Sequence, residues 1–220
     1  MKHKHFVSLL GLLAIAVVGM PSAIAADTSS GFYVGGNVGQ SRVKIDTGAI
    51  DAAILSTGLV ATSATTAQET DIGLKLFAGY RFHPNFAVEG DYFNLGVFTT
   101  TTVTTGPAVT LSGTAKNENG FNLDLVGIVP FNDSFSGFAR LGVQNSETKI
   151  SLVGVGPGGT AAFSTSESKT NWKAGLGLQY YFTKSIGARA EWERYRVPNG
   201  DGTGGTADVD LFSLGLVVRF

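Results

Sequence analysis

The sequence predicts an all-β fold, an eight-stranded antiparallel up-and-down barrel that crosses a membrane. Three observations lead to this prediction. Hydrophobic residues recur with a period of two over segments of about ten residues, which is the spacing of strands with one apolar face. Short and long connections alternate along the chain. Charged residues share a face with most glycines, whereas bulky apolar residues take the other face, as expected for a narrow barrel surrounded by lipid.

The composition excludes several functional classes. Charged residues make up 15% of the 220 residues, and 16 Lys and Arg against 17 Asp and Glu give a formal net charge of -1. Nucleic-acid-binding chains are rich in charge and often strongly basic, so a nucleic-acid partner is not expected. Cysteine is absent, which excludes thiol nucleophiles, thiolate metal sites and disulfides.

Residues 1–25 are predicted to be a cleaved signal peptide, and residues 26–220 the barrel domain. Two lysines precede an apolar stretch over residues 6–18, and Ala23-Ile24-Ala25 supplies the small residues that a signal peptidase needs. The stretch is shorter than the ~20 residues of a spanning helix. We therefore expect the mature chain to be exported.

Eight segments are predicted as strands from this alternation. In chain order they are residues 32–42, 71–82, 86–98, 121–131, 135–144, 172–182, 186–195 and 211–220. The pattern is cleanest in 71–82, 172–182 and 211–220. In the first of these, Ile72, Leu74 and Leu76 alternate with Gly73 and Lys75.

The connections predict how the barrel is oriented. Residues 83–85, 132–134 and 183–185 are short and carry turn-forming residues. Residues 43–70, 99–119, 145–171 and 196–208 are long and rich in Thr, Ser and Gly, so they are predicted to be exposed loops. With an even number of strands both chain ends lie at the turn end, which is the periplasmic side of outer-membrane barrels. The long loops are then extracellular.

A soluble barrel of lipocalin type is the structural alternative, but it would hide its apolar face inside. Here the bulky apolar residues face outward, and six phenylalanines fall beside the short turns or at the chain end. An aromatic girdle at the periplasmic membrane surface explains this position. The six are Phe82, Phe86, Phe131, Phe135, Phe182 and Phe220.

Five segments of the chain resemble the OmpA-like eight-stranded outer-membrane barrels. They are Gly31-Phe32-Tyr33-Val34-Gly35-Gly36-Asn37-Val38-Gly39, Gly79-Tyr80-Arg81-Phe82-His83-Pro84 ahead of Glu89, Phe138-Ala139-Arg140-Leu141-Gly142, Ala188-Arg189-Ala190-Glu191-Trp192 and Leu214-Gly215-Leu216-Val217-Val218-Arg219-Phe220. The resemblance covers nearly the whole mature chain. It implies a Gram-negative outer membrane, with lipids and lipopolysaccharide as surroundings. It also implies that the barrel assembly machinery recognises Phe220 as a C-terminal signal.

The resemblance extends to the membrane domain only. The chain ends with the last predicted strand, so a periplasmic peptidoglycan-binding domain and anchoring to the cell wall are not expected.

Charged side chains on the inward face are predicted to form ion pairs, because an unpaired buried charge costs several kcal/mol. Six cations face six carboxylates: Lys75, Arg81, Arg140, Lys173, Arg189 and Arg219 against Asp71, Glu89, Asp91, Asp124, Glu191 and Glu193. The resemblance implies that Glu89 and Arg189 match an interior network that blocks or gates the lumen. The central set is Lys75, Glu89, Asp124, Arg140, Lys173, Arg189 and Glu191. Two interpretations stay open, a polar core that fills the barrel and a gate built on Glu89, Arg140, Arg189 and Glu191.

Basic residues gather at the strand ends away from the short turns. They could bind lipopolysaccharide phosphates through charge-assisted hydrogen bonds, or they could simply mark where strands leave the bilayer. The candidates are Arg42, Lys44, Lys116, Lys149, Lys169 and Arg194.

The first long loop contains two apolar stretches, residues 49–55 and 59–61, with a partial helical period. They predict a short helix folded across the barrel mouth, with a surface patch for a partner as the alternative.

Catalysis is not expected. His83 is the only histidine of the mature chain, and it lies in a short turn without a Ser and Asp arranged for nucleophilic attack. No cofactor or metal is predicted. The sequence favours a structural or surface-interaction protein that meets an unknown ligand through its loops. The alternative is a narrow or gated porin-like channel for small or hydrophobic solutes.

Overall fold

The computed structural model describes residues 30–198 and 205–220, and only the backbone of residues 117 and 118. The predicted signal peptide lies outside the described residues. The elements are β1 (Gly31–Val43), α1 (Thr47–Ser56), β2 (Thr62–Gln68), β3 (Thr70–His83), β4 (Phe86–Asn94), β5 (Phe98–Thr105), β6 (Val109–Pro130), β7 (Phe135–Gly156), β8 (Gly159–Tyr181), β9 (Ile186–Pro198) and β10 (Thr206–Arg219). No helix in the described ranges is long and apolar enough to cross a membrane.

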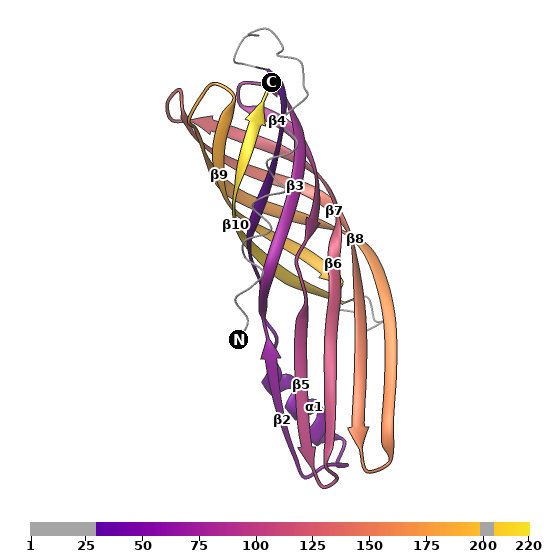
Figure 1. The fold of residues 1–220 in the computed structure, drawn as a ribbon. Helices are drawn as coiled ribbons and strands as arrows, with labels where there is room; N and C mark the ends of the chain where they lie inside the picture. Colours follow the sequence, from indigo (N-terminus) through magenta and orange to yellow (C-terminus); the bar gives the residue numbers. More distant parts are fainter. Residues whose placement is uncertain (1–29, 199–204) are drawn as a thin grey trace, which may run out of the picture.

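Eight of the strands close into an antiparallel ring. Following the pairings, the order is β1, β3, β4, β6, β7, β8, β9, β10 and back to β1. The short turns between β3 and β4, β6 and β7, and β8 and β9 lie at the same end as the C-terminus (Figure 1). The predicted barrel, its strand count and its orientation of turns are confirmed.

The two faces of the wall also follow the predicted alternation. In β3, Lys75 and Phe77 are buried, while Leu74, Leu76 and Tyr80 are exposed. The bulky apolar side chains therefore cover the outside, where lipid replaces water. The outward phenylalanines of the turn end form ring pairs, Phe82 with Phe86 and Phe131 with Phe135.

Two of the long connections, residues 99–119 and 145–171, differ from the prediction because they are mostly strands, and the connection over residues 43–70 contains the short strand β2. β2, β5 and the outer halves of β6, β7 and β8 continue the sheet beyond the barrel and form an extension (Figure 1). β6 and β7 have 22 residues each and β8 has 23, about twice what a tilted strand needs to cross the bilayer. In β2 and β5 threonine explains the difference, because it is polar like a loop residue but β-branched like a strand residue.

Two irregularities change the predicted strand bounds. The segment expected over residues 86–98 stops at Asn94, because Gly96 has a φ of 88° and its N–H is held by the Asn94 side chain. In β6 one extra residue between Lys116 and Asn119 bulges out of the pairing with β7. Such a bulge moves every residue beyond it to the other face.

The predicted helix exists, but it does not cross the barrel mouth. α1 packs on β2 within the extension, where the Ser63 and Thr65 hydroxyls donate to Asp51 at 2.7 and 2.6 Å. No residue of α1 is buried. These hydrogen bonds, Thr65 first, hold the pKa of the Asp51 carboxyl below its ordinary value. The mouth is filled by apolar side chains instead.

The barrel interior is layered along its axis. At the outer end Val43, Phe93, Leu95, Phe98, Tyr195, Val197, Val209 and Leu211 form one buried apolar cluster. At the turn end Tyr33, Phe77, Ala87, Val126, Phe138 and Val217 form another. Charged side chains occupy the layer between them.

Candidate functional site

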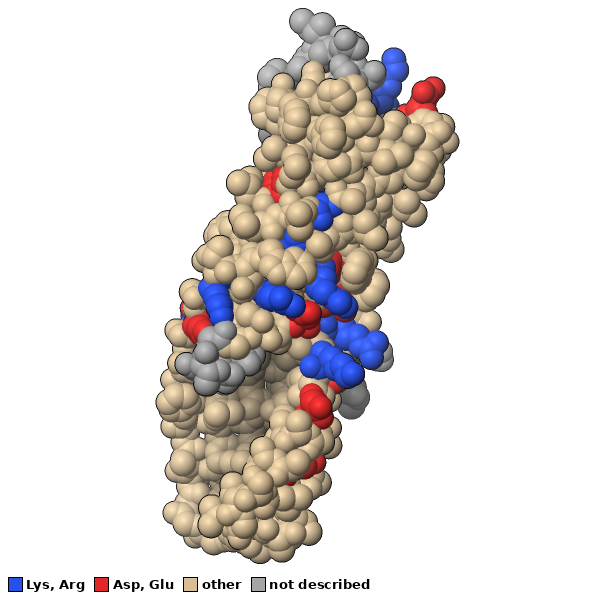
Figure 2. Space-filling view, turned by 180° about the vertical axis from the view of Figure 1, so that it is seen from behind, with Lys and Arg blue, Asp and Glu red and all other residues tan. Residues whose placement is uncertain are grey.

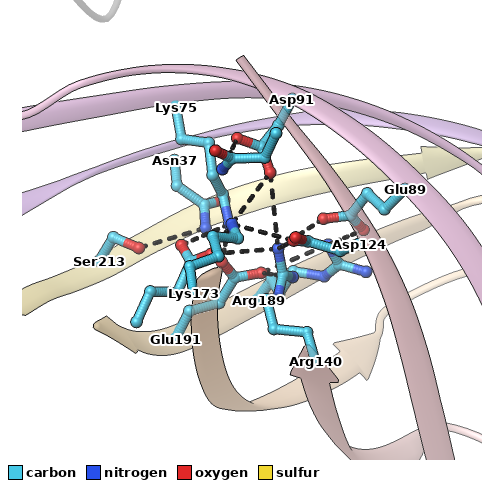
Figure 3. Close-up of polar contacts among 12 residues, drawn as sticks. Asn37, Lys75, Glu89, Asp91, Asp124, Arg140, Lys173, Arg189, Glu191 and Ser213 are labelled. Atoms are coloured by element: carbon cyan, nitrogen blue, oxygen red, sulfur yellow. Dashed lines mark hydrogen bonds and ion pairs between the residues drawn. The ribbon is translucent and has the colours of Figure 1, made fainter. Parts of the chain in front are cut away.

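The charged layer consists of nine buried residues supplied by six strands (Figure 3). They are Lys75 of β3, Glu89 and Asp91 of β4, Asp124 of β6, Arg140 of β7, Lys173 of β8, and Arg189, Glu191 and Glu193 of β9. The structure thus brings together all seven residues of the central set. Asp91 and Glu193 belong to it as well, and the same inward alternation places them there.

Arg140 is the centre of this charge network. Its Nη1 lies 2.7 Å from Glu89 and 3.4 Å from Asp124, and its Nη2 lies 2.8 Å from Glu191. Nη1 also lies 3.2 Å from Glu193. One guanidinium group therefore neutralises carboxylates from three strands, which the planar geometry of arginine allows.

The two lysines complete the outer side of the network. Lys173 Nζ lies 2.7 Å from Glu193, 2.9 Å from Asp124 and 3.3 Å from Asp91. Lys75 donates to Glu191 and, at 2.6 Å, to Glu193. Because each lysine bridges at least two carboxylates, no ion pair of the network stands alone.

Arg189 joins the network to the aromatic residues of the turn end. Its Nη1 lies 2.8 Å from Glu89, and its guanidinium carbon lies 4.5 Å from the Phe77 ring centre and 4.7 Å from that of Phe138. Tyr33 donates to Glu89 at 3.0 Å, and Gln179 accepts from Arg189 at 2.9 Å. Sequence reasoning missed Tyr33 and Gln179, which are uncharged; only their inward alternation could have indicated them.

The predicted balance of six cations and six carboxylates is wrong for this layer, which has four cations and five carboxylates. Arg81 and Arg219 lie at the turn end and donate to the carbonyl oxygens of Pro84 and Lys184. Asp71 lies at the outer end and accepts from the Val97 N–H. The strands are longer than the charged layer, so an inward position alone does not place a residue in it.

Glu89, Asp91 and Asp124 are close enough for one carboxylate oxygen of each to lie within 4.8 Å of the others. Oxygen ligands of this kind suit hard cations. Arg140 and Lys173 already contact the same carboxylates, however, and provide the positive charge that a metal ion would supply. The arrangement is that of an ion-pair network between two apolar clusters.

The predicted basic residues fall into two groups and not one row. Lys116 and Lys149 lie opposite each other on β6 and β7, where Lys149 contacts Glu147 at 3.4 Å. Arg42 and Lys44 lie at the end of β1, and Arg194 lies on β9, where Asp210 of β10 binds it through two contacts of 2.8 Å. Figure 2 shows basic side chains in a band across the middle of the molecule.

Lys169 does not belong to either group. It lies opposite Ser146, which is buried on the inward face of β7, so Lys169 also faces inward. The prediction considered only its position along the chain; alternation along β8 from the inward Lys173 gives the same face.

His83 is exposed in the turn after β3, where its Nδ1 accepts from the Asn85 N–H at 3.2 Å. The neighbouring hydrogen bonds belong to the turn itself.

A family model described as outer membrane protein beta-barrel domain matches residues 10–220. The chain belongs to this family. As a member of the outer membrane β-barrel family it is an integral protein of the Gram-negative outer membrane. The resemblance to OmpA-like barrels is thereby confirmed for the family, the fold and the location.

Several solved barrels are similar in structure. Ail of Yersinia pestis is 19% identical with a TM-score of 0.46, and the match covers 87% of this chain and 98% of Ail. Neisserial surface protein A is 15% identical with a TM-score of 0.49, covering 87% and 99%. The outer membrane protease OmpT from Escherichia coli is 12% identical with a TM-score of 0.40, covering 87% and 95%. No curated protein sequence gives a significant match.

Proposed function

We propose that this outer-membrane barrel is a rigid support for the extension, and that the extension is the part that meets a ligand outside the cell. The observation that carries the proposal is the continuation of β6, β7 and β8 well past the bilayer as paired strands. Paired strands hold a surface in a defined shape, which a flexible loop does not.

The inner face of the extension supports this role. By register, Leu111, Leu152 and Phe163 lie on the face that continues the barrel lumen, and their side chains are 40%, 49% and 62% exposed. The extension is hollowed on the side seen in Figure 2. Exposed apolar side chains gathered in one place are typical of interaction sites.

The filled lumen argues against the channel alternative. Two apolar clusters and the charge network lie in series along the axis, and the recess beside Arg189 has a volume of about 10 Å³, room for about one water molecule. In a planar bilayer we expect the protein to insert without discrete conductance steps. Regular openings that increase in an Arg189→Ala variant would contradict this and favour a gate.

The surface role is tested by shortening the hairpin of β7 and β8. Residues 150–165 are replaced by a two-residue type I′ turn, which joins the opposed Lys149 and Ser166 and leaves the barrel unchanged. Cells that display equal amounts of each protein are compared for adherence to one another and to protein-coated surfaces. We expect adherence with the intact protein and its loss in the variant. Equal adherence of cells that lack the protein would contradict the proposal.

A further inference from the structure

The charge network is one positive charge short, because its nine residues comprise four cations and five carboxylates, each at most 5% exposed. Arg81 and Arg219, which also point inward, donate to carbonyl oxygens at the turn end. Lys169 is four residues from Lys173, about 13 Å along β8 toward the extension. The undescribed side chains after residue 25 include no lysine or arginine. Because an uncompensated buried charge is strongly unfavourable, the layer needs one further positive charge.

Asp91 is the carboxylate of the network with the weakest ion pairs. Its Oδ2 lies 3.3 Å from Lys173 and 3.9 Å from Arg140. Each of the other four carboxylates has a contact of 2.9 Å or less with a cation. Among the described side chains, only Asn122 forms a hydrogen bond with the Oδ1 of Asp91. This oxygen is therefore the one that the cations of the network neutralise least.

Asn122 contains a buried oxygen atom without a partner. It lies opposite Asp91 on β6 and is 7% exposed, and its Oδ1 accepts no hydrogen bond from any described residue. The amide contacts the Oδ1 of Asp91 at 2.5 Å, which is short for an N–H donor, whose usual distance is about 2.9–3.0 Å, but within the range of O–H donors. Turning the amide round exchanges its nitrogen and oxygen within the same volume. Its oxygen can then accept a hydrogen bond from a protonated carboxyl.

We propose that Asp91 binds a proton, which supplies the missing positive charge of the network. The proton is on Oδ1 and is donated to the Oδ1 of Asn122, while Oδ2 keeps its contacts with Lys173 and Arg140. It is taken up from water when the barrel folds around the layer. Four cations then face four ionised carboxylates and one neutral acid. A divalent metal ion in the same place would instead leave one positive charge in excess.

The proton makes the stability of the barrel depend on pH. An unfolded aspartate is ionised above about pH 4, so above that pH folding takes up one proton and stability falls as the pH rises. Charged and titratable groups face Asp91 from every neighbouring strand that carries one: Lys75 of β3, Glu89 of β4, Asp124 of β6, Arg140 of β7, Lys173 of β8, and Glu193 and Tyr195 of β9. All but the tyrosine belong to the network, so loss of the proton leaves the whole layer with one negative charge.

Infrared spectroscopy of the refolded full chain in lipid vesicles detects the proton directly, because a neutral carboxyl absorbs at a different frequency from an ionised one. At pH 7 we expect one band of a neutral carboxyl, which Asp91→Asn removes. The matched control is Asp133→Asn, which changes an exposed aspartate of the turn between β6 and β7 and should leave the band unchanged.

A second pair of variants distinguishes Asp91 from the neighbouring carboxylates. Asn122→Ala removes the acceptor of the proton and should change the frequency of the band. Gln144→Ala truncates another inward amide, which bonds to the Arg196 carbonyl oxygen, and should leave the frequency unchanged. In urea unfolding of the wild type, the unfolding equilibrium constant should increase about tenfold per pH unit from pH 5 to 7, the effect of one proton, and Asp91→Asn should remove this dependence.

Four results would overturn the proposal. They are the absence of a neutral-carboxyl band in the wild type at pH 7, a band that survives Asp91→Asn, a frequency that Asn122→Ala does not change, and a wild-type stability that does not fall from pH 5 to 7. Absence of the band together with a loss of stability when sodium is replaced by choline would assign the missing charge to a metal ion. If Asp91→Asn does not refold, the wild-type band and its frequency in Asn122→Ala decide between these outcomes.

Discussion

Removal of Arg140 should destabilise the barrel more than any change of an exposed charge. In an Arg140→Met variant four carboxylates, Glu89, Asp124, Glu191 and Glu193, lose a partner within 3.4 Å, and three cations remain in the network for five carboxylates. Breaking a buried ion pair on one side costs about 3–5 kcal/mol, which is about two to four orders of magnitude in the unfolding equilibrium. Methionine keeps most of the apolar volume, so the loss reflects charge and not a cavity.

The matched control is Arg194→Met, because Arg194 is also paired with an aspartate but its side chain is 43% exposed. That change should cost less than about 1 kcal/mol. The assay is reversible urea unfolding of protein refolded in lipid vesicles, followed by fluorescence of Trp172 and Trp192, which leave the bilayer on unfolding. In Arg140→Met/Glu191→Gln one of the two excess carboxylates is removed, which restores the wild-type difference of one, so part of the stability should return. Equal midpoints for Arg140→Met and Arg194→Met would refute the view that the network stabilises the barrel.

Three further predictions concern other parts of the molecule. Hydrogen bonding lowers the pKa of Asp51, so docking of α1 should be fully present above about pH 4 and be lost as the pH falls through the folded-state pKa. The rate of protease cleavage within α1, measured from pH 7 to 3, reports this loss. The Asp51→Asn variant should show no such pH dependence. A Cβ at Gly142 would overlap Asp124 Oδ1 and the backbone of β6, so Gly142→Ala should cost about 1–3 kcal/mol in urea unfolding. Gly127→Ala, whose nearest neighbour would be 4.0 Å away, should cost less than about 0.5 kcal/mol, and equal costs would contradict the overlap. Phe220 faces lipid, so Phe220→Ala should change the stability of refolded protein little. It should reduce the amount of barrel assembled in cells, which is measured by the heat-modifiable mobility of the protein in gel electrophoresis. Unchanged assembly would argue against the role of Phe220 as a signal.

The chain itself determined the barrel, the end at which its turns lie, and the face that each residue of the wall occupies. The reason is that lipid on one side and a packed lumen on the other leave each side chain only one compatible face. Lys75, Arg140 and Glu191 could therefore be placed inside from alternation alone. The girdle of phenylalanines could be placed for the same reason.

Only the tertiary structure decided which inward charges meet. Lys75 and Glu191 are 116 residues apart, and the ring of strands and its register bring them together. The bulge before Asn119 acts in the same way, because a shift of one residue exchanges the faces of a strand. The extension was hidden for a related reason. A threonine-rich segment is compatible with both loop and strand, and it becomes a strand here because a neighbouring strand offers it hydrogen-bond partners.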